Sequence, residues 1–203
     1  MNEQATLLQL PRQISPHDPP ARDLDAAADG ARMLLTGLGV DLTGTHTTGT
    51  AERMVKALAE MLTPQVFDPT LFDSGAGTDL VLVSGIGFNA LCAHHVLPFT
   101  GTADIAYIPG EQVIGLSKLP RATASAAARL QVQEEFTTDL ADWVQTTTGA
   151  GGVGVRVRAQ HLCMSCRGAR STAETTTVAT RGLLATDPAR RAEWLGLLAT
   201  AVA

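Results

Sequence analysis

The chain has 203 residues, of which 45% are hydrophobic and 17% charged, and its formal net charge is -5. The length suits one domain, or one domain with a small helical appendage, and the composition excludes an intrinsically disordered chain. The negative charge argues against a general nucleic-acid binder, which needs a basic surface. It leaves room for a small anionic substrate held by a local group of Lys and Arg.

The amino-terminal segment has no cationic stretch followed by an apolar run. No apolar stretch approaches the roughly 20 residues that span a bilayer. We therefore expect a soluble, cytoplasmic protein without a membrane partner. Residues 1–18 have little periodicity and several prolines in or beside them, so they predict a mobile arm.

Two amphipathic helices are predicted next. The first begins near Pro20 and ends at Gly39, because the apolar residues between them recur at helical spacing. The second spans residues 51–62, and its Arg53 and Lys56 lie three apart on a face away from the apolar stripe.

From residue 79 onward the pattern changes to short apolar runs separated by Gly and Pro. These runs predict strands over residues 80–88, 101–109 and 112–118. Residues 120–147 have the Ala-rich character of one long helix, and a Gly-rich break follows at residues 149–152.

The last third predicts a hairpin and a closing helix. Residues 152–163 alternate apolar with small or charged side chains, as a half-buried strand does, and the Thr-rich residues 171–182 predict its hairpin partner. Asp187 and Pro188 supply an N-cap and a first-turn proline for a helix that carries Trp194. The whole pattern predicts an α+β fold with helices outside an antiparallel sheet.

Two short clusters contain all three cysteines and three of the five histidines: residues 92–95 (Cys-Ala-His-His) and residues 161–166 (His-Leu-Cys-Met-Ser-Cys). Three cysteines are too few, and odd in number, for a disulfide framework. Zinc prefers thiolate and imidazole ligands, and pairs of closely spaced ligands from distant segments build most such sites. The clusters therefore predict a metal site; the alternative is buried structural thiols beside unrelated histidines.

Two assemblies of this metal site follow from the residues. Cys92, His95, Cys163 and Cys166 together would make a closed structural site. The first three alone would leave a fourth position open for water and therefore for catalysis. The spacing does not choose between these assemblies.

The chain resembles the GTP cyclohydrolase I family over residues 48–183, on five motifs in the family's order. These are ERMVKAL, LCAHHVLPFTGTADIAYIP, VIGLSKLPR, LQVQEEFT and HLCMSCRGARSTAETTT. The resemblance implies a tunnelling fold, an antiparallel sheet backed by helices after an N-terminal helical segment, assembled into a homodecamer with active sites between subunits. On this basis we assign residues 1–47 to an arm and helix and residues 48–203 to the catalytic domain.

The resemblance implies that Cys92, His95 and Cys163 hold a catalytic Zn2+ and that Cys166 lies outside its ligands, which selects the open site. Zinc in such a site supplies hydroxide near neutral pH. The implied reaction is attack at C8 of the guanine of GTP, opening of the imidazole ring, release of formate and rearrangement to 7,8-dihydroneopterin triphosphate.

The resemblance also implies roles for residues around the metal. His94 and His161 match the family's proton-transfer histidines. Glu134 matches the carboxylate that anchors guanine, and Gln133 is expected to support that contact. The residues that match triphosphate and sugar-phosphate contacts are Lys118, Arg121, Arg167 and Ser117, with Arg53 and Lys56 adding charge from another subunit.

The chain departs from the family's usual sequence at two places. Ala93 stands where the family usually has Glu beside the first zinc-site cysteine, and a usual Val-Arg-Asp run is here Val83-Ser84-Gly85. Loss of a carboxylate beside the ligands predicts impaired or redirected turnover. Two alternatives follow. One is a divergent paralogue that acts on GTP or a related purine nucleotide and stops at a hydrated or ring-opened product. The other is a non-catalytic, zinc-stabilised nucleotide-binding oligomer.

Overall fold

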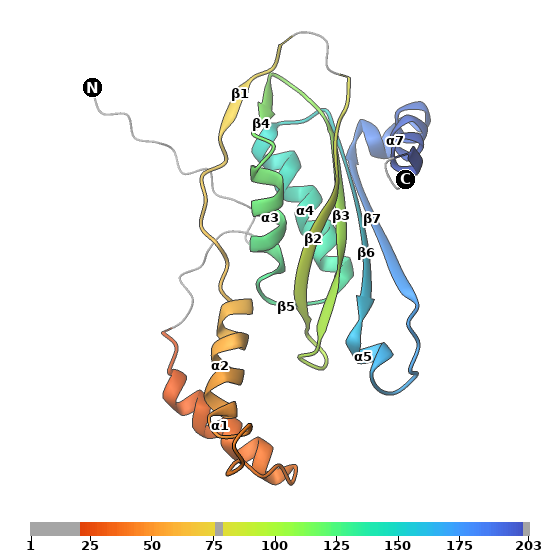
Figure 1. Ribbon diagram of the computed structural model, residues 1–203. Coiled ribbons are helices and arrows are strands. Elements are labelled where there is room, and N and C mark those ends of the chain that lie inside the picture. Colours follow the sequence, from red (N-terminus) through yellow and green to blue (C-terminus); the bar gives the residue numbers. More distant parts are fainter. Residues whose placement is uncertain (1–20, 76–78, 201–203) are drawn as a thin grey trace, which may run out of the picture. The chain divides into compact units, whose positions relative to one another are not determined.

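The computed structural model describes residues 21–75 and 79–200 (Figure 1). The arm predicted over residues 1–18 lies outside them. The chain divides after Thr63 into two compact units, one that holds the first two helices and one that begins at Pro64. No helix among the described residues is long and apolar enough to cross a membrane.

The smaller unit is a pair of helices, α1 (Leu24–Gly37) and α2 (Thr50–Met61). Helix α1 begins where it does because the Asp23 carboxylate accepts a hydrogen bond from the Ala26 N–H at 2.9 Å. It ends before Gly39, whose φ of 80° needs glycine. Both predicted helices are present. The first is shorter than expected, because it begins at Leu24 and not near Pro20, and the second lies within one residue of its predicted bounds.

The larger unit is built on a five-stranded sheet with the order β5-β2-β3-β6-β7. Its strands are β2 (Val81–Cys92), β3 (Pro98–Ile108), β5 (Leu130–Gln131), β6 (Gly152–His161) and β7 (Glu174–Gly182). The pairs are antiparallel except that β5 lies parallel to the end of β2. A second, two-stranded sheet pairs β1 (Leu71–Asp73) with β4 (Gln112–Ile114). The antiparallel pairing of β6 with β7 confirms the predicted hairpin. The strand expected over residues 112–118 is too long, since β4 ends at Ile114 and Lys118 already begins a helix.

One face of the sheet packs against helices α3 (Lys118–Ala127) and α4 (Gln133–Thr148) (Figure 1). Phe88 joins the two layers, because its ring lies 5.8 Å from that of Phe99 in β3 and 4.6 Å from that of Phe136 in α4. The expectation of one helix over residues 120–147 is wrong. The chain leaves the helix to pair Leu130 and Gln131 with the end of β2.

The other face is covered at one end by α6 (Leu183–Thr186) and α7 (Pro188–Thr200). Trp194 and Leu198 of α7 are buried against Ala106 and Leu184. As predicted, Asp187 caps this helix, since its carboxylate accepts a hydrogen bond from the Ala189 N–H at 2.8 Å.

Gly101 of β3 lies close against the main chain of β6, which leads to a prediction about stability. A Cβ at this position would lie 1.9 Å from the carbonyl oxygen of Arg158 and 2.7 Å from the Cα of Ala159, both of them main-chain atoms. Gly101→Ala must therefore push two central strands apart. We expect a loss of about 1–3 kcal/mol of unfolding free energy, seen as a lower thermal midpoint at matched protein concentration.

Gly87→Ala is the matched control for Gly101→Ala. Gly87 lies in the neighbouring strand β2, and a Cβ there would meet no atom within 4 Å. Its unfolding free energy should stay within about 0.5 kcal/mol of the parent. Equal midpoints for the two variants would contradict the close approach at Gly101.

Candidate metal centre and active site

The two predicted clusters meet at one end of the five-stranded sheet. Cys92 is the last residue of β2, and a short turn leads to Pro98, the first residue of β3. Phe99, next along β3, pairs with His161, the last residue of β6. The strand predicted to continue to residue 163 ends at His161, and the helical turn α5 (Leu162–Ser165) then places Cys163 at the same end.

The turn between β2 and β3 is closed by main-chain hydrogen bonds. The Cys92 N–H donates to the Leu97 carbonyl at 2.9 Å, and the Val96 N–H donates to the Cys92 carbonyl at 2.9 Å. Val96 has a φ of 54°, a left-handed conformation that a β-branched residue rarely adopts. The turn therefore stores backbone strain, of order 1–3 kcal/mol, beside the ligand candidates.

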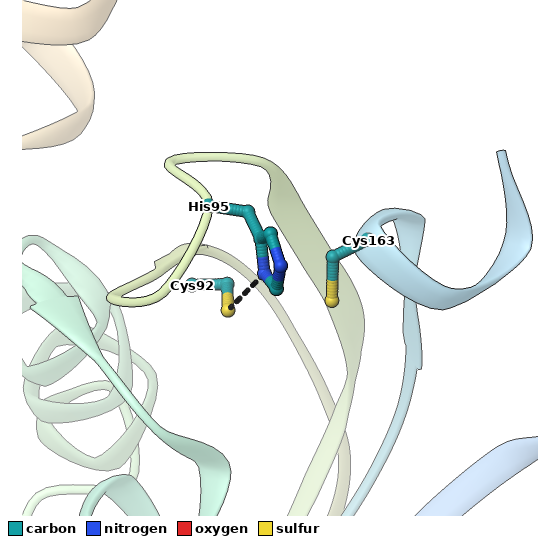
Figure 2. A group of neighbouring side chains, drawn as sticks. All are labelled: Cys92, His95 and Cys163. Carbon is teal, nitrogen blue, oxygen red and sulfur yellow. Dashed lines mark hydrogen bonds between the residues drawn. The ribbon is translucent and has the colours of Figure 1, made fainter. Parts of the chain in front are cut away.

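Cys92, His95 and Cys163 form a group that can hold a metal ion (Figure 2). One ligand atom from each lies within 4.8 Å of the other two, and the Cys92 Sγ to His95 Nδ1 distance is 3.9 Å. Ligand atoms of a tetrahedral zinc site lie about 3.5–3.8 Å apart, given Zn–S of about 2.3 Å and Zn–N of about 2.0 Å. The donor set and its spacing thus fit Zn2+ after a small contraction.

Burial, and then the neighbouring Cys92, raise the pKa of the Cys163 thiol. A cation bound beside the Cys163 thiol would favour its ionised form. Cys166 stands outside the group: it is exposed, and its S–H donates to the Leu162 carbonyl at 2.7 Å. The geometry therefore favours three protein ligands over four.

Both predicted proton-transfer histidines lie beside this group. The Nδ1 atom of His94 is 3.9 Å from the Cys92 Sγ, and its ring lies 6.2 Å from that of His95. The ring of His161 stacks on Phe99 with centroids 4.8 Å apart and an interplanar angle of 4°. Burial lowers the pKa of His161, and the charge of Glu134 partly opposes this effect.

Gln133 and Glu134 open helix α4 but lie in different surroundings. Glu134 is exposed, close enough to His161 to act on it electrostatically. Gln133 is only 1% exposed, and its Oε1 accepts from the Nε2 of His161 at 2.8 Å. Its amide nitrogen donates into strands β6 and β7. Sequence reasoning missed Phe99 and Thr177 as neighbours of these residues, since an apolar and a Thr-rich strand carry no signal for this contact.

The predicted basic residues fall in three places. Arg167 follows α5, and its Nη1 lies 3.3 Å from the Nε2 of His95, so it brings positive charge to the metal candidates. Lys118 and Arg121 share the first turn of α3 with Ser117 as its N-cap residue. The others lie on α2 in the smaller unit: Arg53, which bonds Thr48, His46 and Thr50, and the exposed Lys56.

Comparison with known proteins decides the family. The sequence profile described as GTP cyclohydrolase I matches residues 27–199. The chain belongs to the GTP cyclohydrolase I family. GTP cyclohydrolase 1 of Aquifex aeolicus (strain VF5) is 40% identical over 180 residues, 88% of this chain and 98% of that protein. GTP cyclohydrolase 1 of Hydrogenobaculum sp. (strain Y04AAS1) is 39% identical over 178 residues, 87% of this chain and 98% of that protein.

Family membership confirms the expected tunnelling fold of α+β class and the expected enzyme class, a GTP cyclohydrolase I-like hydrolase. It also confirms GTP as the family's substrate and the nucleotide-binding character of the chain. The individual site residues named above stay predictions, as does the division of the chain at residue 48.

Proposed function

We propose that this protein hydrolyses the guanine imidazole ring of GTP at C8 with the help of Zn2+, releases formate and forms 7,8-dihydroneopterin triphosphate. The observation that carries the proposal is the convergence of Cys92, His95 and Cys163 beside two further histidines, in a chain of this family. The reaction belongs to pterin biosynthesis and one-carbon metabolism.

The proposed metal ligands are two thiols and one imidazole, a set typical of zinc. With three protein ligands the site keeps an open position, and zinc bound there supplies hydroxide near neutral pH. The exposure of His95 is consistent with an open side through which substrate arrives. His94 and His161 would move protons at the imidazole nitrogens of guanine as the ring opens.

Substrate recognition is assigned to charges around this centre. The exposed carboxylate of Glu134 is free to accept hydrogen bonds from the ring N–H and the exocyclic amine of guanine. The triphosphate would be held by Lys118, Arg121 and Arg167, with Ser117 near the sugar-phosphate and Arg53 and Lys56 contributing from another subunit. A local basic group of this kind works despite the net charge of -5.

We further propose that the chain works as a homo-oligomer, a decamer, in the cytoplasm. Large apolar side chains stand on the surface of α1: Met33 is 76% exposed and Leu34 53%, and Leu38 at its end is 71% exposed. Large apolar side chains exposed together on one helix typically mark a protein contact. Subunit assembly would also bring charge from α2 of one subunit to the active site of another.

Product analysis tests the proposed reaction. Zinc-loaded protein incubated with GTP should release one formate per pterin formed, measured by mass spectrometry and by a formate assay. Accumulation of a hydrated or ring-opened nucleotide without pterin would instead support the divergent paralogue, which the loss of a carboxylate at Ala93 motivates. Stoichiometric zinc and bound GTP without any product would support the non-catalytic oligomer.

A further inference from the structure

The amide of Gln133 is fixed in one orientation by its partners. Its Nε2 donates to the main-chain carbonyls of Val157 at 3.1 Å and Thr175 at 3.0 Å, and lies 3.1 Å from the Thr177 hydroxyl. A flipped amide would place its oxygen against two carbonyl oxygens, which only accept hydrogen bonds. The Oε1 atom must therefore be the one that faces His161.

This orientation determines which ring nitrogen of His161 carries a hydrogen. The Oε1 of Gln133 only accepts, and it lies 2.8 Å from the Nε2 of His161, so Nε2 must donate. In the neutral ring the hydrogen is then absent from Nδ1. Among the described residues no hydrogen bond reaches that Nδ1, which leaves its lone pair available.

We propose that Gln133 is a positioning residue that fixes the tautomer of His161, with the hydrogen on Nε2 and the lone pair on Nδ1. The proposal rests on the proton-transfer role of His161 in the proposed function, and it assigns that transfer to Nδ1. Phe99 stacks on the same ring and prevents it from turning out of the Gln133 contact. Both polar atoms of the Gln133 side chain already have hydrogen-bond partners within the chain.

The tautomer can be observed without any assay of turnover. Magic-angle-spinning 15N NMR of the zinc-loaded protein labelled at histidine distinguishes a protonated from an unprotonated ring nitrogen, and the His161→Ala spectrum assigns the signals. We expect the neutral His161 ring to carry its hydrogen on Nε2. A hydrogen on Nδ1 in the parent protein would overturn the proposal.

Gln133→Met removes the acceptor while keeping a side chain of similar length. We expect the tautomer signal to become mixed, kcat with GTP to fall about 10–100-fold, and KM and zinc content to stay unchanged. Thr177→Val is the matched control, because it removes one partner of Gln133 but leaves the Oε1 contact and two carbonyl acceptors. It should keep the parent tautomer and kcat.

A double variant separates action through His161 from contact with substrate. If Gln133 acts through His161, adding Gln133→Met to His161→Ala should change the residual rate by less than about twofold. A further tenfold loss, or a rise in KM alone in Gln133→Met, would show a direct substrate contact and overturn the proposal. An unchanged rate in His161→Ala would remove that histidine from the proposed function, while the NMR result would still decide the tautomer.

Discussion

Cys163→Ala is expected to lose bound zinc and GTP turnover together. Cys163 supplies one of three protein ligand atoms, so its removal leaves Cys92 and His95, too few to hold the ion in place. Without the ion no activated water is present, and we expect the rate to fall by at least about 10³-fold. Metal analysis after dialysis, with formate release in the same sample, measures both losses.

Cys166→Ala is the control, because Cys166 lies three residues further along the chain and outside the ligand group. It should keep one zinc per chain and near-parent turnover. Retained zinc and activity in Cys163→Ala would reject the site as assigned. Loss of metal and fold in Cys166→Ala would instead indicate the closed, four-ligand site.

Glu134→Ala is expected to remove the preference for guanine while leaving zinc bound. The carboxylate is the proposed acceptor for the ring N–H and the exocyclic amine, a pair of charge-assisted contacts worth about 2–4 kcal/mol. The parent should therefore use GTP far better than inosine triphosphate, which lacks the exocyclic amine. In Glu134→Ala the two kcat/KM values should approach each other, with kcat/KM for GTP lowered about 30–800-fold.

Glu135→Ala provides the comparison for Glu134→Ala. Glu135 is the next residue in the first turn of α4 and is also exposed, so it carries the same charge at nearly the same place. It should leave the ratio of GTP to inosine triphosphate use unchanged. The ratio is the decisive quantity, because a general change in the field at His161 would affect both nucleotides alike.

The parts of the fold that the sequence predicts well are those with a strong local signal. Helices α1 and α2 follow from apolar spacing, and Gly39 marks the end of the first. The N-cap role of Asp23 is visible only in the structure. The metal group is predicted because cysteine and histidine are rare in the chain and are concentrated in two short segments. These signals come from residues that are close together in the sequence, so they can be recognised without knowledge of tertiary contacts.

The parts that the sequence does not predict depend on distant partners. The break between α3 and α4 is made by Leu130 and Gln131, a strand of two residues too short to show any alternation. The alternation of side chains predicted a strand up to residue 163. The strand β6 ends at His161 instead, where the chain turns into the short helix α5. A glutamine inside a predicted helix carries no sign of burial, so the buried position of Gln133 is visible only in the structure, where β6, β7 and His161 surround it.

The position of the metal group also has a consequence for folding. Cys92 and Cys163 belong to β2 and to the turn after β6, which are separated in the sheet by β3. An ion bound by both would link these two segments across β3, and because it binds the folded arrangement it would stabilise the fold against unfolding. Depletion of the ion would therefore have two effects. It would remove the reactive centre, and it would remove the link between the end of β2 and the turn after β6.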